Sequence, residues 1–305
     1  MNHSKPSQTA RDLVRGAYDM HVHSGPDVIK RIGHDIEIAQ RFHKVGLGGF
    51  VIKSHYAPTA GRAALTRAMV PEVNVMGAIC LNQAMGGMNA IAVEMAAREG
   101  ARLVWFPTVD AENEPVGRKP PVPGANIPFW AHMQHQLRDE GVFSEAVPVV
   151  DAEMNVLPEV HTVLQSIAKH DMILATAHLS RDEIFAVVDA AIAAGVKRIT
   201  ITHPEFPSQN LSPQDQAALA ERGAFLEHCI ASIYFKKYTW EQVFANIRYT
   251  GIAQCYFASD LGQPTKPPVE DGLALAADKA LEAGFSHAEI QQMFAENTRR
   301  LVQGL

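Results

Sequence analysis

The 305-residue sequence has only three cysteines, no long apolar run and no cluster of basic residues. The cysteines are odd in number and lack CxxC spacing, so we expect a reducing compartment in which they pack as small buried residues. Lysines and arginines are scattered over a chain of net charge -6, which gives no reason to expect a nucleic acid or an anionic membrane as partner. No apolar stretch reaches the roughly 18 residues that span a bilayer. The partner that remains is a small-molecule substrate.

The first ten residues are polar and carry no apolar signal core, so the expected location is the cytoplasm. With 47% hydrophobic residues, a chain of this length can bury roughly three quarters of its unfolded surface. We therefore expect one domain over residues 1–305, and we expect it to form a homo-oligomer.

Short apolar runs alternate with segments of helical periodicity along the chain. Glycines at 195, 223, 251 and 284 stand where helix C-caps belong. The strands are too uniformly apolar for a sheet with one solvent-exposed face. The pattern therefore predicts an α/β fold, a closed (β/α)8 TIM barrel with a C-terminal helix. The expected strands cover 19–23, 49–53, 74–81, 101–106, 172–177, 198–202, 223–227 and 254–258. The expected helices cover 35–45, 59–69, 89–98, 159–170, 181–194, 213–221, 240–249 and 272–283.

One segment after the fourth strand, at about 107–158, is too long for a βα loop. Its first part, 114–124, is rich in proline and glycine, which excludes regular structure. A short helix at 129–138 and a small hairpin of 147–150 with 154–157 are expected further on. Loops that follow barrel strands overhang the active face, so this insertion is interpreted as a lid or pocket wall, with an inert surface excursion as the alternative.

Histidines and an aspartate stand at the ends of the predicted strands. His21 and His23 are two apart on the first strand, so both can address one ion. His178, His203 and Asp260 follow the fifth, sixth and eighth strands. The ends of parallel barrel strands converge on one mouth, where a divalent ion would satisfy these polar groups together.

The same set resembles the ligands of the amidohydrolase superfamily, whose barrels carry HxH on strand one, histidines on strands five and six, and aspartate on strand eight. The stretch 295–301 also resembles the helix that often closes these proteins. The resemblance implies a metal-bound hydroxide that cleaves a small amide, cyclic amide or lactone. It further implies that Asp260 is both a ligand and the catalytic proton shuttle. One or two divalent ions are expected, with Zn²⁺ favoured and Mn²⁺ or Fe²⁺ as alternatives.

The fourth strand departs from the best-known binuclear members, because it ends in Trp105 and Phe106 without a bridging lysine or glutamate. Lys53 follows three apolar residues at the end of the second strand. Three interpretations of it stay open: a carboxylated lysine that bridges two ions, a cation that holds a substrate anion, and a structural ion pair.

Substrate-binding candidates are less well defined, and each has an alternative. His55 is interpreted as a metal ligand, a substrate hydrogen-bond donor or a residue behind the site. Glu205 is either a substrate contact or a surface carboxylate, and His228 stands at the end of strand seven. Arg118 is either a clamp for a substrate carboxylate or a solvated loop charge.

Two other functions compete with hydrolysis on this scaffold. A mononuclear nonoxidative decarboxylase, or a deaminase, would use a single ion with Lys53 uncarboxylated. A catalytically silent metal-binding protein should have lost its shuttle residue, and the presence of Asp260 argues against it.

Overall fold

A computed structural model describes residues 4–117, 119, 127, 129–142 and 145–304. Within these residues, eight parallel strands form one sheet in chain order, which confirms the predicted barrel. Val22 bridges Leu261 just beyond the last strand, so the first and last strands close the ring. The strands are β1 Tyr18–Val22, β2 Gly49–Ile52, β3 Asn74–Cys80, β4 Ala101–Trp105, β5 Ile173–Ala175, β6 Arg198–Thr202, β7 Phe225–Cys229 and β8 Cys255–Ala258.

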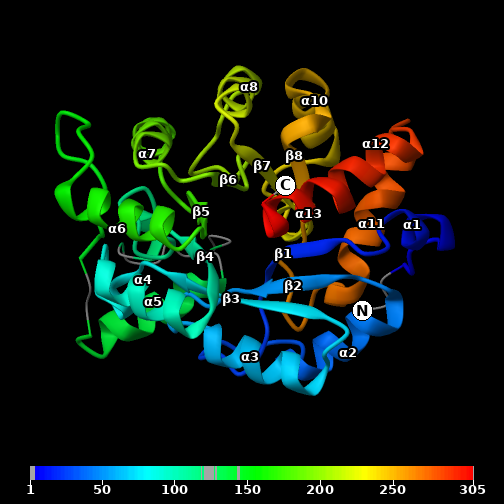
Figure 1. The fold of residues 1–305 in the computed structure, drawn as a ribbon, viewed down its shortest axis with the longest axis horizontal. Coiled ribbons are helices and arrows are strands. Elements are labelled where there is room, and N and C mark those ends of the chain that lie inside the picture. The colour runs from blue at the N-terminus through cyan, green and yellow to red at the C-terminus, as the bar shows by residue number, and fades with distance from the viewer. Residues whose placement is uncertain (1–3, 118, 120–126, 128, 143–144, 305) are drawn as a thin grey trace.

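Helices surround the ring of strands, as Figure 1 shows. They are α1 Gln8–Leu13, α2 Asp35–Val45, α3 Ala60–Met69, α4 Ala90–Glu99, α5 Phe129–Asp139, α6 Pro158–Lys169, α7 Arg181–Ala193, α8 Pro213–Glu221, α9 Ile230–Tyr234, α10 Trp240–Thr250, α11 Val269–Glu282, α12 His287–Gln291 and α13 Asn297–Gln303. Short 3-10 turns η1 Gln83–Met85, η2 Pro115–Gly117 and η3 Ile252–Gln254, and the π-helical turn η4 Gln292–Glu296, complete the elements. None of the helices in the described part has both the length and the apolar character of a membrane span.

Helix α2 shows how the sequence pattern produces these elements. Ile38, Ala39 and Phe42 recur at helical spacing and are buried, which places one face of the helix on the barrel. The helix ends at Gly46, whose φ of 80° is the left-handed conformation that glycine adopts without steric cost. Both ends agree with the predicted range.

The closing helix α13 is anchored to the start of β8. The Asn297 side-chain amide donates to the carbonyls of Ile252 and Cys255 at 2.8 and 2.7 Å, and Asn297 is fully buried. Paired in this way, the buried amide carries no desolvation penalty. The C-terminal helix therefore positions the strand that leads to Asp260.

The segment between β4 and α6 contains α5, as predicted, but the expected hairpin is reduced to one antiparallel bridge between Val150 and Val156. The turn explains this difference, because the Asp151 carboxylate accepts hydrogen bonds from the backbone N–H groups of Glu153 and Asn155. Such a side-chain turn competes with ladder pairing. The hairpin prediction was thus too extended.

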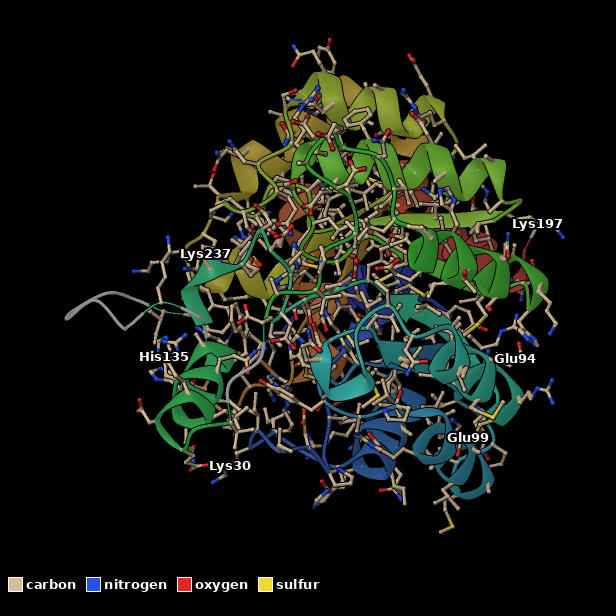
Figure 2. All side chains as sticks on the ribbon, turned by 90° about the vertical axis from the view of Figure 1, so that its left-hand side faces the viewer. Lys30, Glu94, Glu99, His135, Lys197 and Lys237 are labelled. Atoms are coloured by element: carbon tan, nitrogen blue, oxygen red, sulfur yellow. The ribbon has the colours of Figure 1, made fainter. Side chains whose placement is uncertain are left out.

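This segment lies at the end of the barrel where the strands terminate. Figure 2 shows His135 of α5 on the same end as Lys30 and Lys237, which belong to the loops after β1 and β7. Glu99 and Lys197, which lie just before β4 and β6, are at the opposite end of the barrel. The insertion therefore belongs to the mouth face, where barrel enzymes carry their sites.

Candidate metal centre

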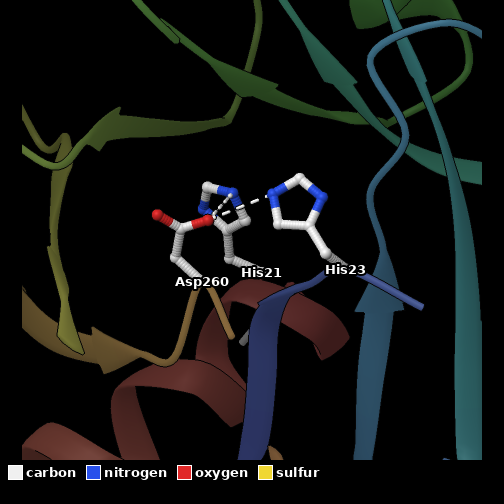
Figure 3. Close-up of side chains that lie close together, drawn as sticks. All are labelled: His21, His23 and Asp260. Carbon is white, nitrogen blue, oxygen red and sulfur yellow. Dashed lines mark ion pairs between the residues drawn. The ribbon is translucent and has the colours of Figure 1, made fainter. Parts of the chain in front are cut away.

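Two histidines at the end of β1 face an aspartate that follows β8 (Figure 3). The Nε2 atoms of His21 and His23 lie 3.2 and 3.1 Å from the same oxygen, Asp260 Oδ1. The backbone holds this arrangement, since the Asp260 N–H donates to the His21 carbonyl and the His23 N–H donates to the Leu261 carbonyl, both at 2.8 Å. The first and last strands of the barrel thus build the cluster together.

The chemistry of these three residues fits a divalent ion. One ligand atom from each lies within 4.8 Å of the other two. The contact of His21 Nε2 with Asp260 is not a hydrogen bond, so this nitrogen is buried and unpaired at the centre of the group. Burial lowers the pKa of both imidazoles well below the usual value, with the neighbouring cations Lys53 and Arg31 as further causes, so both rings are neutral. A neutral imidazole is the form of histidine that binds metal.

His178 and His203 lie on the other side of the same mouth, after β5 and β6. Their ring centroids are 4.9 Å apart, and the His203 and His21 rings are 6.5 Å apart. Burial, and next the charge of His178, lowers the pKa of His203. Neither residue belongs to a group of three mutually close ligand atoms within the described residues. The structure brings all five predicted side chains to one mouth, and the coordination by His178 and His203 stays a prediction.

Carboxylates stand behind two of the histidines. Glu227 Oε1 lies 2.9 Å from His21 Nδ1, and Glu114 Oε1 lies 3.2 Å from His178 Nδ1. The Ser208 hydroxyl donates to Glu114 Oε1 at 2.5 Å. A carboxylate on one ring nitrogen orients a histidine so that its other nitrogen can bind metal. Glu227 therefore sets the direction of Nε2 on His21, whereas Glu114 lies beside His178 without a hydrogen bond to its Nδ1.

Sequence reasoning gave neither glutamate this role. For Glu227 a signal was present, because a charged residue within an apolar strand indicates a buried partner. Burial raises the pKa of Glu227 to about 8. Glu114 lies in the Pro/Gly-rich part of the insertion, where no periodicity singles out a residue.

Lys53 points into the barrel mouth from the end of β2. The residue is 1% exposed, and its Nζ lies 4.9 Å from the centroid of the Trp105 ring. Among the described residues, no ion pair or hydrogen bond involves this amine. A buried amine without a carboxylate partner is costly unless a ligand or a chemical modification satisfies it. The structure thus gives no support to the structural ion pair considered for Lys53.

His55 lies beside His23, with ring centroids 5.2 Å apart. Its Nδ1 is 2.8 Å from the Thr108 hydroxyl, and Asn82 donates both to that hydroxyl and to the His55 carbonyl. Burial, and next Lys53, lowers the pKa of His55 well below the usual value. The ring is therefore a neutral group that is held rigidly at the pocket wall.

Asp260 has the most accessible side chain of the three-residue cluster, 19% exposed against 1% for His21 and 4% for His23. Burial raises the pKa of Asp260, while Lys53 and then His203 oppose that shift. The backbone at Asp260 is left-handed, with φ of 52°, a conformation that aspartate adopts more readily than most residues. The carboxylate can therefore contact both an ion and a bound substrate.

Two further substrate-binding candidates pair with each other. His228 Nδ1 lies 3.0 Å from Glu205 Oε1, which also accepts from the Asn246 amide at 3.1 Å. Their side chains are 0% and 4% exposed, and neither residue is among those that line the mouth pocket. Arg118 lies outside the described residues.

The pocket over this cluster is open to solvent and has an empty volume of about 730 Å³. Ile127 and Trp130 of the insertion are among its lining residues, and the role of the whole segment as a lid or pocket wall stays a prediction. The lining residues are His23, Ile29, Arg31, Lys53, His55, Ile127, Trp130, His178, His203, Phe206, Ser232, Phe235, Lys237, Asp260 and Gln263.

The structure is thus a (β/α)8 barrel with histidines and an aspartate gathered at its mouth. Residues 16–227 match the model of a family described as "Family of unknown function (DUF6282)", and the chain belongs to this family. No curated protein matches the sequence.

Solved structures share the fold at low sequence identity. An amidohydrolase from Pseudomonas aeruginosa has a TM-score of 0.64 at 11% identity, with 99% of this chain and 100% of that chain covered. A probable dipeptidase from the same organism has a TM-score of 0.58 at 11% identity, with 96% of each chain covered. An organophosphorus hydrolase from Deinococcus radiodurans has a TM-score of 0.56 at 13% identity, with 99% of this chain and 100% of that chain covered.

Proposed function

We propose that the protein is a metal-dependent hydrolase of small amides, cyclic amides or lactones. The observation that carries this proposal is the convergence of His21 Nε2 and His23 Nε2 on Asp260 Oδ1 at the barrel mouth. His178 and His203 face that cluster within the same pocket. The names of the structures that share the fold, an amidohydrolase and a probable dipeptidase among them, agree with this class of reaction.

The ion would be held by His21, His23 and Asp260, with His178 and His203 as further ligands. A divalent ion supplies a water of lowered pKa, about 7, and a Lewis acid for the substrate carbonyl. Asp260 accepts the proton of the attacking water and returns it to the leaving group, because its carboxylate borders both the ligands and the pocket. Glu227 holds the ring of His21 in the orientation that the reaction needs, through the contact of its Oε1 with His21 Nδ1.

Lys53 supplies the bridging group in this proposal. Its ammonium would lose one proton to solvent, and the resulting amine would add CO₂ and release a second proton, which converts a cation without a carboxylate partner into an anionic oxygen ligand. The support is the burial of Lys53 beside Trp105 and the lack, within the described residues, of an ion-pair partner. Such a ligand would allow the site to hold two ions, for which we propose Zn²⁺, and would supply them with an anionic oxygen.

A nonoxidative decarboxylase is the second candidate. The observation that favours it is the compactness of His21, His23 and Asp260, whose mutual distances suit one ion, while β4 ends in Trp105 rather than a bridging residue. In that reaction a single ion would bind the substrate, and Lys53 would remain an ammonium.

The deciding experiment counts ions and follows products. Protein purified without chelator is analysed for metal, stripped, and reloaded with Zn²⁺, Mn²⁺ or Fe²⁺. Each form is then offered N-acyl amino acids, dipeptides, cyclic amides and lactones, and CO₂ release is measured in parallel. Hydrolysis that depends on the ion and is lost in Asp260→Asn supports the proposal. Ion-dependent CO₂ release with one ion per chain would replace it by the decarboxylase, and a lack of any ion would overturn both.

A further inference from the structure

A buried arginine lines the mouth pocket outside the predicted ligand set. Arg31 belongs to the loop between β1 and α2, and its side chain is 5% exposed. Its Nε and Nη2 lie 2.8 and 2.7 Å from Asp27 Oδ2, and the Asp27 side chain is 1% exposed. The ion pair thus uses one edge of the guanidinium. Among the described residues, Nη1 has no hydrogen-bond partner.

The backbone fixes this arginine next to the metal cluster. The N–H of Ile32 donates to the Gly262 carbonyl at 2.8 Å, two residues beyond Asp260. Gly25 donates to the Gly33 carbonyl at 2.8 Å, which ties the two ends of the loop together. The loop therefore cannot carry Arg31 away from the mouth without breaking the contacts that also hold the segment after β8.

The pocket wall carries more buried positive than negative charge. Arg31 and Lys53 are buried cations, whereas Asp260 is the only carboxylate among the described residues that line the pocket. Any divalent ion adds further positive charge. A neutral substrate would leave the second edge of Arg31 desolvated and unpaired, which is costly, while a carboxylate can accept two parallel N–H bonds from that edge.

We infer that Arg31 is the residue that binds a carboxylate of the substrate and that Asp27 positions it. The substrate is then an amide, cyclic amide or lactone that carries a carboxylate away from the bond that reacts. The inference rests on the proposed function for the reaction itself, and it adds the chemical class of the substrate. The Arg118 clamp considered from sequence is not needed for this role.

The test uses calorimetry with matched acid and amide pairs, from acetate and acetamide to adipate and adipamide. Metal-loaded wild-type protein should bind at least one acid about tenfold or more tightly than its amide, since hydrogen bonds to an ionised carboxylate are stronger than those to a neutral amide. Arg31→Gln should remove that preference with the amide affinity unchanged, and Arg31→Lys should keep part of it. Arg41→Gln is the matched control, because Arg41 is 38% exposed on α2 and its Nη1 is 3.9 Å from Glu270.

A second variant covers the risk that Arg31→Gln leaves Asp27 buried and unpaired and so fails to fold. Asp27→Asn combined with Arg31→Gln removes both charges of the pair and should also lose the acid preference. A folded Arg31 variant with the wild-type preference, or a wild-type protein that prefers no acid, would overturn the inference. An acid preference that disappears on metal removal but survives Arg31→Gln would also overturn it, because the ions alone would then bind the acid.

These readouts separate the inference from the proposed function. A protein that hydrolyses nothing but loses its acid preference in Arg31→Gln contradicts the hydrolase and supports the anion site. A protein that hydrolyses carboxylate-bearing substrates equally well before and after Arg31→Gln supports the hydrolase and contradicts the anion site.

Discussion

Asp260 and His21 are joined at two points, through the backbone N–H of Asp260 on the His21 carbonyl at 2.8 Å and through Asp260 Oδ1 at 3.2 Å from His21 Nε2. The first contact belongs to the seam that closes the barrel, and the second belongs to the candidate site. Because the same residue takes part in both, the site can be no less rigid than the seam. Preorganisation of this kind is what a metal centre and a proton shuttle need.

Replacement of individual histidines should remove metal and activity together. His21→Ala deletes a member of the compact group, and His203→Ala deletes a ring on the opposite side of the mouth, so each weakens the shared coordination sphere. Metal content by mass spectrometry and turnover of a hydrolysed substrate should fall in parallel. His161→Ala on the exposed side of α6 is the control and should retain both. Unchanged metal content in the two ligand variants would show that the centre is misplaced.

Asp260→Asn should separate binding from catalysis. The amide oxygen can still coordinate weakly but cannot take up a proton, so we expect much of the metal to remain while turnover falls by about 10²- to 10⁴-fold. Metal analysis and kcat on the same preparation measure both effects. Near-normal turnover with full metal content would rule out the shuttle role.

Lys53→Ala should lose the second ion and most of the activity if the amine is carboxylated. A short-chain carboxylic acid added in trans should restore part of both, since it replaces the missing oxygen ligand, whereas an added amine should not. Metal count and rate are measured against the concentration of each additive. Rescue by the amine, or a wild-type protein that holds one ion, would assign Lys53 to substrate binding instead.

Trp130→Ala should change substrate choice without changing metal content. Trp130 enters the pocket wall from α5, and its ring centroid is 6.2 Å from that of His178, yet it offers no ligand. We expect a rise in KM of about tenfold for large apolar substrates, because a pocket contact of this size contributes a few kcal/mol at most. If Trp130→Ala has the same KM as the wild type for small substrates and for large ones, the insertion would be a passive wall.

The buried pair of Glu205 and His228 should make stability fall at high pH. Burial lowers the pKa of His228, but the Glu205 carboxylate outweighs it and raises the pKa to about 10 from the ordinary 6.5. Folded protein thus keeps a proton that unfolded protein loses, so this stabilisation is complete below about pH 6.5 and declines until about pH 10. In urea unfolding, the difference in the free energy of unfolding between the wild type and the double variant Glu205→Gln/His228→Gln should shrink as the pH rises through this window. A gap that stays constant would exclude a charged pair.

Much of the fold could be predicted because its signals are local. The apolar period of α2 and the glycine after it define that helix to the residue, and strand β6 agrees equally well. Helix α9 was missed, since Ile230–Tyr234 follows β7 without a break in apolar character and is too short to show periodicity. Helix α1 was missed because its residues are mostly polar and only Ala10 and Leu13 are buried.

The candidate site divides in the same way. His21, His23 and Asp260 could be brought together from two features that the sequence shows. Side chains two apart on a strand point the same way, and the ends of successive barrel strands meet at one mouth. The partners behind the histidines could not be found so easily. Glu114 lies 64 positions before His178 in the sequence and reaches it through an irregular loop, and Arg31 faces the pocket only because of the path of the loop around it. Contacts of that kind depend on tertiary geometry that no periodicity encodes.

The seam between β1 and the segment after β8 also sets the order in which a growing chain can acquire its site. Gly262 lies so close to this seam that a Cβ atom there would be 1.7 Å from the His23 carbonyl oxygen, so the last turn has to fit against an already formed first strand. During synthesis the His21 and His23 pair emerges early, but its aspartate follows only after more than 200 further residues. Until then the two histidines have no third ligand from β8. The complete set of five proposed ligands is therefore in place only after the ring has closed.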